Sequence, residues 1–65
     1  MITIDYRSRE PIYRQIISSI EDLAAKGFMA ADEQLPSVRS LAMELSINPN
    51  TIQRAYNELE RRGII

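Results

Sequence analysis

The chain contains no cysteine and no histidine among its 65 residues. Disulfides and the usual Cys/His metal sites are therefore excluded, and a serine nucleophile activated by histidine cannot form. We expect no enzyme activity, no cofactor and no metal site. The absence of cysteine also fits a reducing cytosol. No apolar run approaches the roughly 18 residues of a membrane span, and no signal-peptide pattern opens the chain.

The chain also lacks a surplus of charge of either sign. Eight basic and nine acidic side chains give a net charge of −1 at pH 7. This balance counts mildly against nucleic-acid binding, because domains that bind DNA usually carry a basic stripe. Affinity for DNA depends on where the charges lie rather than on their sum. No glycine-containing loop of spaced oxygen ligands is present, so we interpret these carboxylates as solvated: Asp5, Glu10, Glu21, Asp22, Asp32 and Glu33.

The chain length permits one small domain, whose fold rests on helix packing alone or with help from a second chain. Residues 1–10 are predicted to form an extended arm. Apolar residues at spacings of four and three then predict an amphipathic helix over about 11–26, which ends before Gly27. Its polar face carries Glu21 and Asp22 with few lysines, which disfavours binding to an anionic membrane.

A second, shorter helix is predicted over about 37–45. Residues 28–36 are interpreted as a connection, because Pro36 favours an extended conformation at Leu35. The helix begins at Pro36-Ser37. Its buried face is predicted to consist of Val38, Leu41, Ala42 and Leu45.

A third helix is predicted over about 49–62. Asn48-Pro49 opens it, because asparagine is a preferred N-cap and proline suits the first helical position, and Gly63 ends it. At 100° per residue, apolar side chains gather on one side: Ile52, Ala55, Tyr56 and Leu59. The opposite side is polar and gathers Asn50, Gln53, Arg54, Asn57 and Arg61.

The polar side of this third helix differs from an ordinary solvated face, which is usually rich in Glu and Lys. It carries amides and arginines, the side chains that make bidentate contacts with base edges in the major groove of DNA. Glu58 and Glu60 fall towards the flanks, so the centre of this side is not acidic. A solvated face without function is the common alternative for any surface helix, but this composition favours DNA contact.

The second and third helices have the spacing of a helix-turn-helix over about 38–57. The small Ala42 permits close approach of the two helices, and Ile47 is expected to fill the corner between them. A turn of three or four residues sets such helices at roughly 90–120° and leaves the first half of the second one free to enter a groove. Ser46 occupies a turn position that is often glycine, because its φ tends to be positive, so we expect some strain there.

Several stretches that together cover nearly the whole chain carry a family resemblance. They are Leu35-Pro36-Ser37-Val38-Arg39-Ser40-Leu41-Ala42, Asn48-Pro49-Asn50-Thr51-Ile52-Gln53-Arg54-Ala55-Tyr56 and Leu59-Glu60-Arg61-Arg62-Gly63. The pattern resembles the GntR family of bacterial transcription regulators. The arm is similar to the YtrA subfamily in Ile4-Asp5-Tyr6-Arg7-Ser8, Pro11-Ile12-Tyr13 and Gln15-Ile16. The resemblance implies a winged-helix fold, of which this all-α chain holds the three-helix helix-turn-helix core.

The resemblance also implies which residues contact an operator. Ser37 and Arg39 would hold a backbone phosphate or reach a base, and the start of the third helix would do likewise. Gln53 stands where many relatives have arginine, so we take no base preference from the family. With the polar side of the third helix, the predicted DNA-contacting residues are Ser37, Arg39, Asn48, Pro49, Asn50, Thr51, Gln53, Arg54 and Asn57. The backbone N–H groups at the helix N-termini would add phosphate donors.

In the family, a β-hairpin wing and a C-terminal domain follow the glycine that corresponds to Gly63. We interpret the chain as a fragment, a shortened version or a natural remnant of a longer regulator, with the β wing missing. The resemblance implies a repressor that binds a palindromic operator in double-stranded DNA as a homodimer of the full-length protein. A small-molecule effector would bind outside this segment, and we expect this piece to bind DNA poorly by itself.

A helical protein–protein interaction or dimerisation module without DNA binding is the alternative function. Its support is the net charge of −1, the small size, and apolar residues expected to be uncovered without a wing, namely Leu35, Ile64 and Ile65. A steep salt dependence of binding to generic duplex DNA would distinguish DNA binding from this alternative.

Overall fold

The computed structural model describes residues 2–27 and 35–65. Within these ranges it contains three α-helices and no strand: α1 (Ile12–Ala25), α2 (Val38–Leu45) and α3 (Pro49–Arg61). The all-α, three-helix core expected from the sequence is confirmed, and no helix end differs from its predicted position by more than one residue. Of the predicted connection over 28–36, only Leu35 and Pro36 lie within the described residues.

Local capping explains why α2 and α3 begin where they do. The Ser37 hydroxyl oxygen accepts from the Ser40 backbone N–H at 3.0 Å. The Asn48 side-chain oxygen accepts from the Asn50 backbone N–H at 2.8 Å, and Pro49 fills the first helical position. Each cap satisfies a donor that the helix itself leaves unpaired, an interaction typically worth about 1 kcal/mol.

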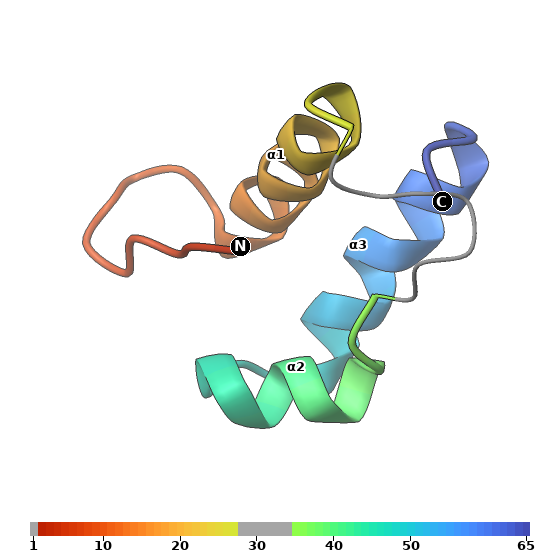
Figure 1. Cartoon of the computed structure of the whole chain (residues 1–65). Helices are drawn as coiled ribbons and strands as arrows, with labels where there is room; N and C mark the ends of the chain where they lie inside the picture. Colours follow the sequence, from red (N-terminus) through yellow and green to blue (C-terminus); the bar gives the residue numbers. More distant parts are fainter. Residues whose placement is uncertain (1, 28–34) are drawn as a thin grey trace.

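The core forms where the three helices meet, with α3 in the middle. In Figure 1, α3 passes between α1 and α2, and its backbone approaches both of them closely. The buried residues are Ile16, Ile17, Ile20, Leu41, Ala42, Ile52, Ala55 and Leu59. All except Ile17 come from the apolar faces predicted for the helices, whereas Val38, Leu45 and Tyr56 of those faces are only half-buried. Full burial of each large aliphatic side chain stabilises the fold by roughly 1.5–3 kcal/mol.

The turn between α2 and α3 has the backbone expected for a helix-turn-helix. Ser46 adopts φ 56° and ψ 46°, the left-handed conformation that an L side chain rarely adopts. The Ile47 N–H donates to the Ala42 carbonyl at 3.0 Å, which closes the turn. Ile47 itself packs against the core, so it fills the corner as predicted.

The arm is not extended over its whole predicted length. Residues 2–5 have no regular secondary structure, and the chain then turns and bends through 6–10 before α1 begins. Ile2 and Ile4 pack against the core. The Gln15 side chain binds the backbone of both Asp5 and Glu10, which holds the bend against α1.

The C-terminal residues fold back onto the helices. Gly63 adopts φ 76°, and the Ile64 N–H donates to the Leu59 carbonyl at 2.9 Å. Leu35 and Ile64 pack against the core, so the expectation that they would be uncovered is wrong for both. Ile65 is 39% exposed. In the described part of the chain, no helix is long and apolar enough to cross a membrane.

Candidate nucleic-acid interface

The polar side of α3 faces solvent. Its buried side is formed by Ile52, Ala55 and Leu59. The predicted contact residues on the polar side are all exposed except the half-buried Thr51; the exposed ones are Pro49, Asn50, Gln53, Arg54 and Asn57. The structure therefore brings the predicted α3 residues together on one accessible surface.

Two amides on this surface are coupled. The Gln53 side-chain N–H donates to the Asn57 side-chain oxygen at 2.8 Å, one helical turn further on. The bond joins two exposed side chains, and no described residue binds the Gln53 oxygen or the Asn57 amide nitrogen. Such a pair presents both an acceptor and donors, as recognition of an adenine edge in the major groove requires.

Arg54 lies on the flank of this surface that faces α1. Its guanidinium carbon sits 4.3 Å from the centre of the Tyr13 ring. A cation over an aromatic face is stabilised by about 0.5–1 kcal/mol at an exposed site, and the stack restricts where the guanidinium can point. Arg54 thus has a defined position at the edge of the surface rather than at its centre.

The charges at the C-terminal end of α3 are paired with each other. Glu58 accepts hydrogen bonds from Arg61 at 3.0 Å and from Arg62 at 2.7 Å, and Arg62 also pairs with Glu21 of α1 at 3.1 Å. These bonds lower the pKa of Glu58 to about 2 and raise the pKa of both arginines. Arg61, predicted on the polar side, is therefore engaged within the helix.

The start of α2 forms a second part of the candidate interface. Arg39 is exposed, and it lines an open hollow of about 430 Å³ with Val38, Met43 and Pro49, which joins α2 to the start of α3. No described residue accepts a hydrogen bond from the Val38 or Arg39 backbone N–H. The Ser37 hydroxyl donates to the Ser40 hydroxyl at 2.9 Å while it caps the helix, so its hydrogen-bonding capacity is largely used.

The N-terminus of α3 differs from the expectation that it would offer free backbone donors. Pro49 has no N–H, and the Asn50 N–H binds the Asn48 side chain. The Thr51 N–H donates to the Asn48 carbonyl at 3.0 Å. This helix start therefore offers side chains rather than backbone donors to a ligand.

Tyr56 anchors the candidate interface from behind. Its hydroxyl donates to the Pro36 carbonyl at 2.7 Å, which ties the start of α2 to the middle of α3. Burial raises the pKa of the Tyr56 hydroxyl above its ordinary value of 10.0, so the group remains a neutral donor. Sequence reasoning placed this ring among the apolar residues but missed the bond made by its hydroxyl.

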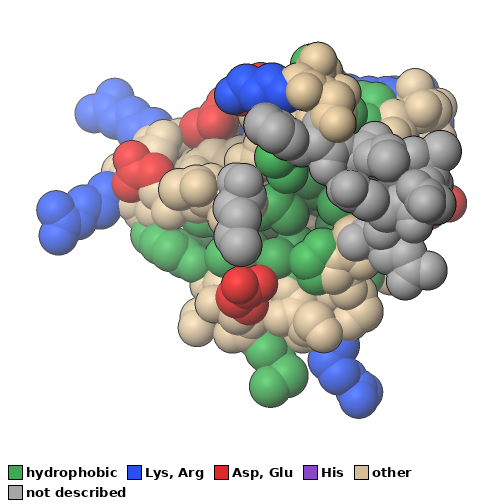
Figure 2. All heavy atoms as spheres, in the orientation of Figure 1, with side chains coloured by type: hydrophobic (Ala, Val, Ile, Leu, Met, Phe, Trp, Pro, Cys, Tyr) green, Lys and Arg blue, Asp and Glu red, His purple; other side chains and the backbone are tan. Residues whose placement is uncertain are grey.

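Basic side chains project from the margins of the molecule. On the face seen in Figure 2, the end formed by the arm carries such side chains at the left, away from the hydrophobic centre. Within the described ranges, no group of three acidic side chains lies close enough to hold a metal ion. The surface is suited to contacts with an anionic polymer through separated cations and amides.

Comparison with known proteins gives a consistent family assignment. The profile of the family described as "Bacterial regulatory proteins, gntR family" matches residues 12–65. The HTH-type transcriptional repressor YtrA of Bacillus subtilis (strain 168) is 55% identical over 65 residues, which are 100% of this chain and 50% of that protein. The uncharacterised HTH-type transcriptional regulator YhcF of the same strain is 43% identical over 60 residues, 92% of this chain and 50% of that protein.

A solved structure agrees with these relatives. The crystal structure of a transcriptional antiterminator from Listeria monocytogenes EGD-e matches 94% of this chain and 46% of that chain, with 43% identity and a TM-score of 0.83. The chain thus spans about half the length of each of these three proteins.

Proposed function

The chain belongs to the gntR family of bacterial regulatory proteins, and from this premise we propose that it binds duplex DNA sequence-specifically with α3 in the major groove. An α-helix with its side chains is about 10–12 Å wide, which matches a major groove about 12 Å wide. The observation that supports the proposal most strongly is the exposed, coupled amide pair of Gln53 and Asn57 on α3.

The residues of the interface divide into two roles. Gln53, Asn57 and Asn50 read base edges, because these amide side chains are exposed on α3. Arg39 at the start of α2 holds a backbone phosphate, together with the unpaired N–H groups beside it. Asn48 and Ser37 act mainly by capping, which fixes where α3 and α2 begin.

The whole regulator acts as a transcription repressor in the cytoplasm. Two copies, joined by parts of the protein outside residues 1–65, bind the half-sites of a palindromic operator. A small-molecule effector binds in the same outside region. A helical interaction module without DNA binding is not favoured, because the similar proteins are named as regulators of transcription.

The test begins with selection of a preferred operator from random duplexes by the wild-type chain. Fluorescence anisotropy then compares Gln53→Ala and Arg39→Ala on that operator and on a scrambled duplex. Gln53→Ala should weaken operator binding by about 1–3 kcal/mol and relax the preference at one base pair. Arg39→Ala should weaken binding to both duplexes by the same factor, and it should reduce the slope of log affinity against log salt by about 1.

Glu60→Ala and Lys26→Ala are the matched controls. Glu60 is exposed on α3, and Lys26 lies at the end of α1 far from α2. Operator binding that is equal for the wild type, Gln53→Ala and Arg39→Ala would contradict the proposed interface.

A further inference from the structure

The arginines of this chain fall into two groups. Arg61 and Arg62 are paired with Glu58 and Glu21. Within the described ranges, the remaining arginines make no ion pair; they are Arg7, Arg9, Arg14, Arg39 and Arg54. Although the net charge of the chain is −1, these arginines are therefore available to bind an anion.

Three of these free cations lie on or beside the bend of the arm, and the bend has a defined shape. The Asp5 carboxylate accepts from the Arg7 N–H at 3.0 Å, and the Ser8 hydroxyl accepts from the Glu10 N–H at 3.0 Å. Asp5 and Glu10, at the two ends of the bend, are both bound by the buried Gln15. Residues 7–9 thus form the exposed part of a bend that is hydrogen-bonded at both ends.

The arm also lies close to the candidate DNA interface. The Tyr6 hydroxyl donates to the Leu45 carbonyl, at the end of α2 and just before the turn into α3. On the other side of the bend, the first turn of α1 contacts α3 through the stack of Tyr13 and Arg54. The bend therefore adjoins the end of α2, and the start of α1 adjoins α3, which carries the base-reading amides.

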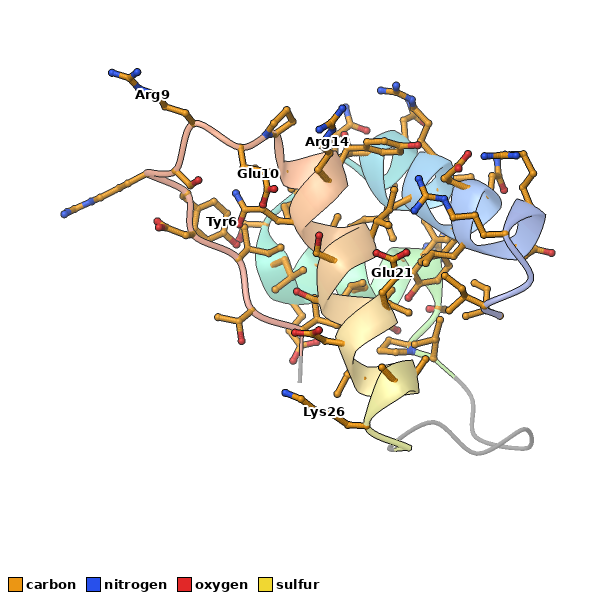
Figure 3. The ribbon with its side chains drawn as sticks, turned by 90° about the horizontal axis from the view of Figure 1, so that it is seen from above. Tyr6, Arg9, Glu10, Arg14, Glu21 and Lys26 are labelled. Carbon is orange, nitrogen blue, oxygen red and sulfur yellow. The ribbon has the colours of Figure 1, made fainter. Side chains whose placement is uncertain are left out.

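The direction of the side chains agrees with this placement. In Figure 3, Arg14 lies at the start of α1, Arg9 extends outward from the bend to the upper left, and Lys26 lies at the opposite end of α1. In Figure 1, α1 and α2 lie on opposite sides of α3. When α3 occupies a groove, its two neighbours face the two sugar–phosphate backbones that border it.

We propose that Arg9 and Arg14, with Arg7 beside them, contact backbone phosphates of duplex DNA on the α1 edge of the groove. Arg39 holds the opposite edge, so the chain grips both strands that border the recognition helix. The contact reads no sequence, because phosphates are the same at every step, and it fixes the orientation of α3. This inference rests on the proposed DNA binding and extends it to the arm.

The test uses the whole chain carrying both Arg9→Gln and Arg14→Gln, with the selected operator and the scrambled duplex as probes. Binding is measured by anisotropy between about 50 and 200 mM salt. Each lost phosphate contact removes about 0.9 from the slope of log affinity against log salt, so the double variant should lose about 1–2. Its affinity should fall by the same factor for both duplexes.

Two further variants give the comparison its controls. Arg9→Lys with Arg14→Lys keeps the charges and should restore most of the slope. Lys26→Gln removes a cation at the far end of α1 and should leave the slope unchanged. Since Arg9, Arg14 and Lys26 are exposed, all three variants should unfold at the wild-type temperature.

Three results would overturn the proposal. One is that the variant with both Arg9→Gln and Arg14→Gln keeps the wild-type salt slope, while Arg39→Ala still reduces this slope. Another is that the double variant loses affinity for the operator but not for the scrambled duplex, which would indicate base reading by the arm. The third is that Lys26→Gln reduces the salt slope as much as the double variant does, which would indicate a general charge effect. Failure of the proposed function itself looks different, because the wild type would then show no operator preference and Gln53→Ala would change nothing.

Discussion

Gln15 is the one polar side chain among the buried residues in the described part of the chain, with 8% of its surface exposed. Its amide oxygen accepts from the Asp5 N–H at 2.8 Å, and its amide nitrogen donates to the Asp5 carbonyl at 3.0 Å and to the Glu10 carbonyl at 2.9 Å. This side chain thus supplies three of the hydrogen bonds that fix the arm to α1, and the Ser19 hydroxyl donates another to the Thr3 carbonyl at 3.4 Å.

Replacement of Gln15 by Leu should destabilise the chain. The leucine fills the volume but leaves one backbone donor and two carbonyl acceptors without a partner, which costs about 1–3 kcal/mol. Urea unfolding measures the difference. Gln53→Leu is the control: it removes an exposed amide and should change the free energy of unfolding by less than about 0.5 kcal/mol. Equal stability of Gln15→Leu and the wild type would mean that water replaces the lost bonds without cost.

Glu58 predicts a pH dependence of stability. Its folded-state pKa of about 2 lies below the ordinary value of 4.5, because it accepts hydrogen bonds from Arg61 and Arg62. A lowered pKa means that the stabilisation is complete above pH 4.5 and is lost as the pH falls from 4.5 towards 2. The melting temperature of the wild type should therefore fall more steeply over this pH range than the melting temperature of Glu58→Gln.

Glu60→Gln is the control for this titration. Glu60 is an exposed carboxylate on the same helix, and it makes no ion pair with a described residue. The pH profile of Glu60→Gln should follow the wild type. Identical profiles for Glu58→Gln and the wild type would show that the Glu58 bonds contribute nothing in solution.

At the scale of elements, the helices and their ends could be predicted because their signals are local. The spacing of apolar residues and the caps Ser37 and Asn48 act within one or two turns of chain. Gln15 lies outside the apolar spacing that predicts α1, so this spacing does not indicate its burial. The partners of its side chain could not be predicted, since they depend on how the arm folds.

The same distinction holds for the candidate interface. The polar side of α3 follows from the helical period alone. The stack of Arg54 on Tyr13 and the bond from Tyr56 to Pro36 join residues about 20 positions apart or more. They arise only once α1, α2 and α3 have packed, and periodicity carries no information about such pairs.

Ser46 lies in the turn that links α2 to α3 and offers a test of strain. With φ 56°, the serine has a conformation that costs an L residue about 1–2 kcal/mol and glycine almost nothing. Glycine also raises the entropy of the unfolded chain, which offsets part of this gain. Ser46→Gly should therefore stabilise the chain by about 0.5–1 kcal/mol, while Ser46→Val should destabilise it. Urea midpoints measure both, and a lower midpoint for Ser46→Gly would show that the turn is not strained.

At the scale of the whole molecule, size limits what one copy can bind. The chain measures 30 × 22 × 20 Å along its principal axes. The centres of two half-sites one helical turn apart are separated by about 34–36 Å. One copy is therefore large enough for one half-site of the proposed operator, and the relatives' additional length leaves room for parts that would join two copies.

Joining two copies artificially should therefore restore tight binding. Two chains fused through a flexible Gly/Ser linker turn the second contact into an intramolecular one, which raises affinity by about 10²–10⁴-fold when the linker spans the sites. We expect this gain on a duplex with two inverted half-sites and not on a duplex with one. Inserting about 5 bp between the half-sites turns them to opposite faces of the helix and should remove the gain. Equal binding of the fusion to one and two half-sites would exclude a palindromic operator read by two copies.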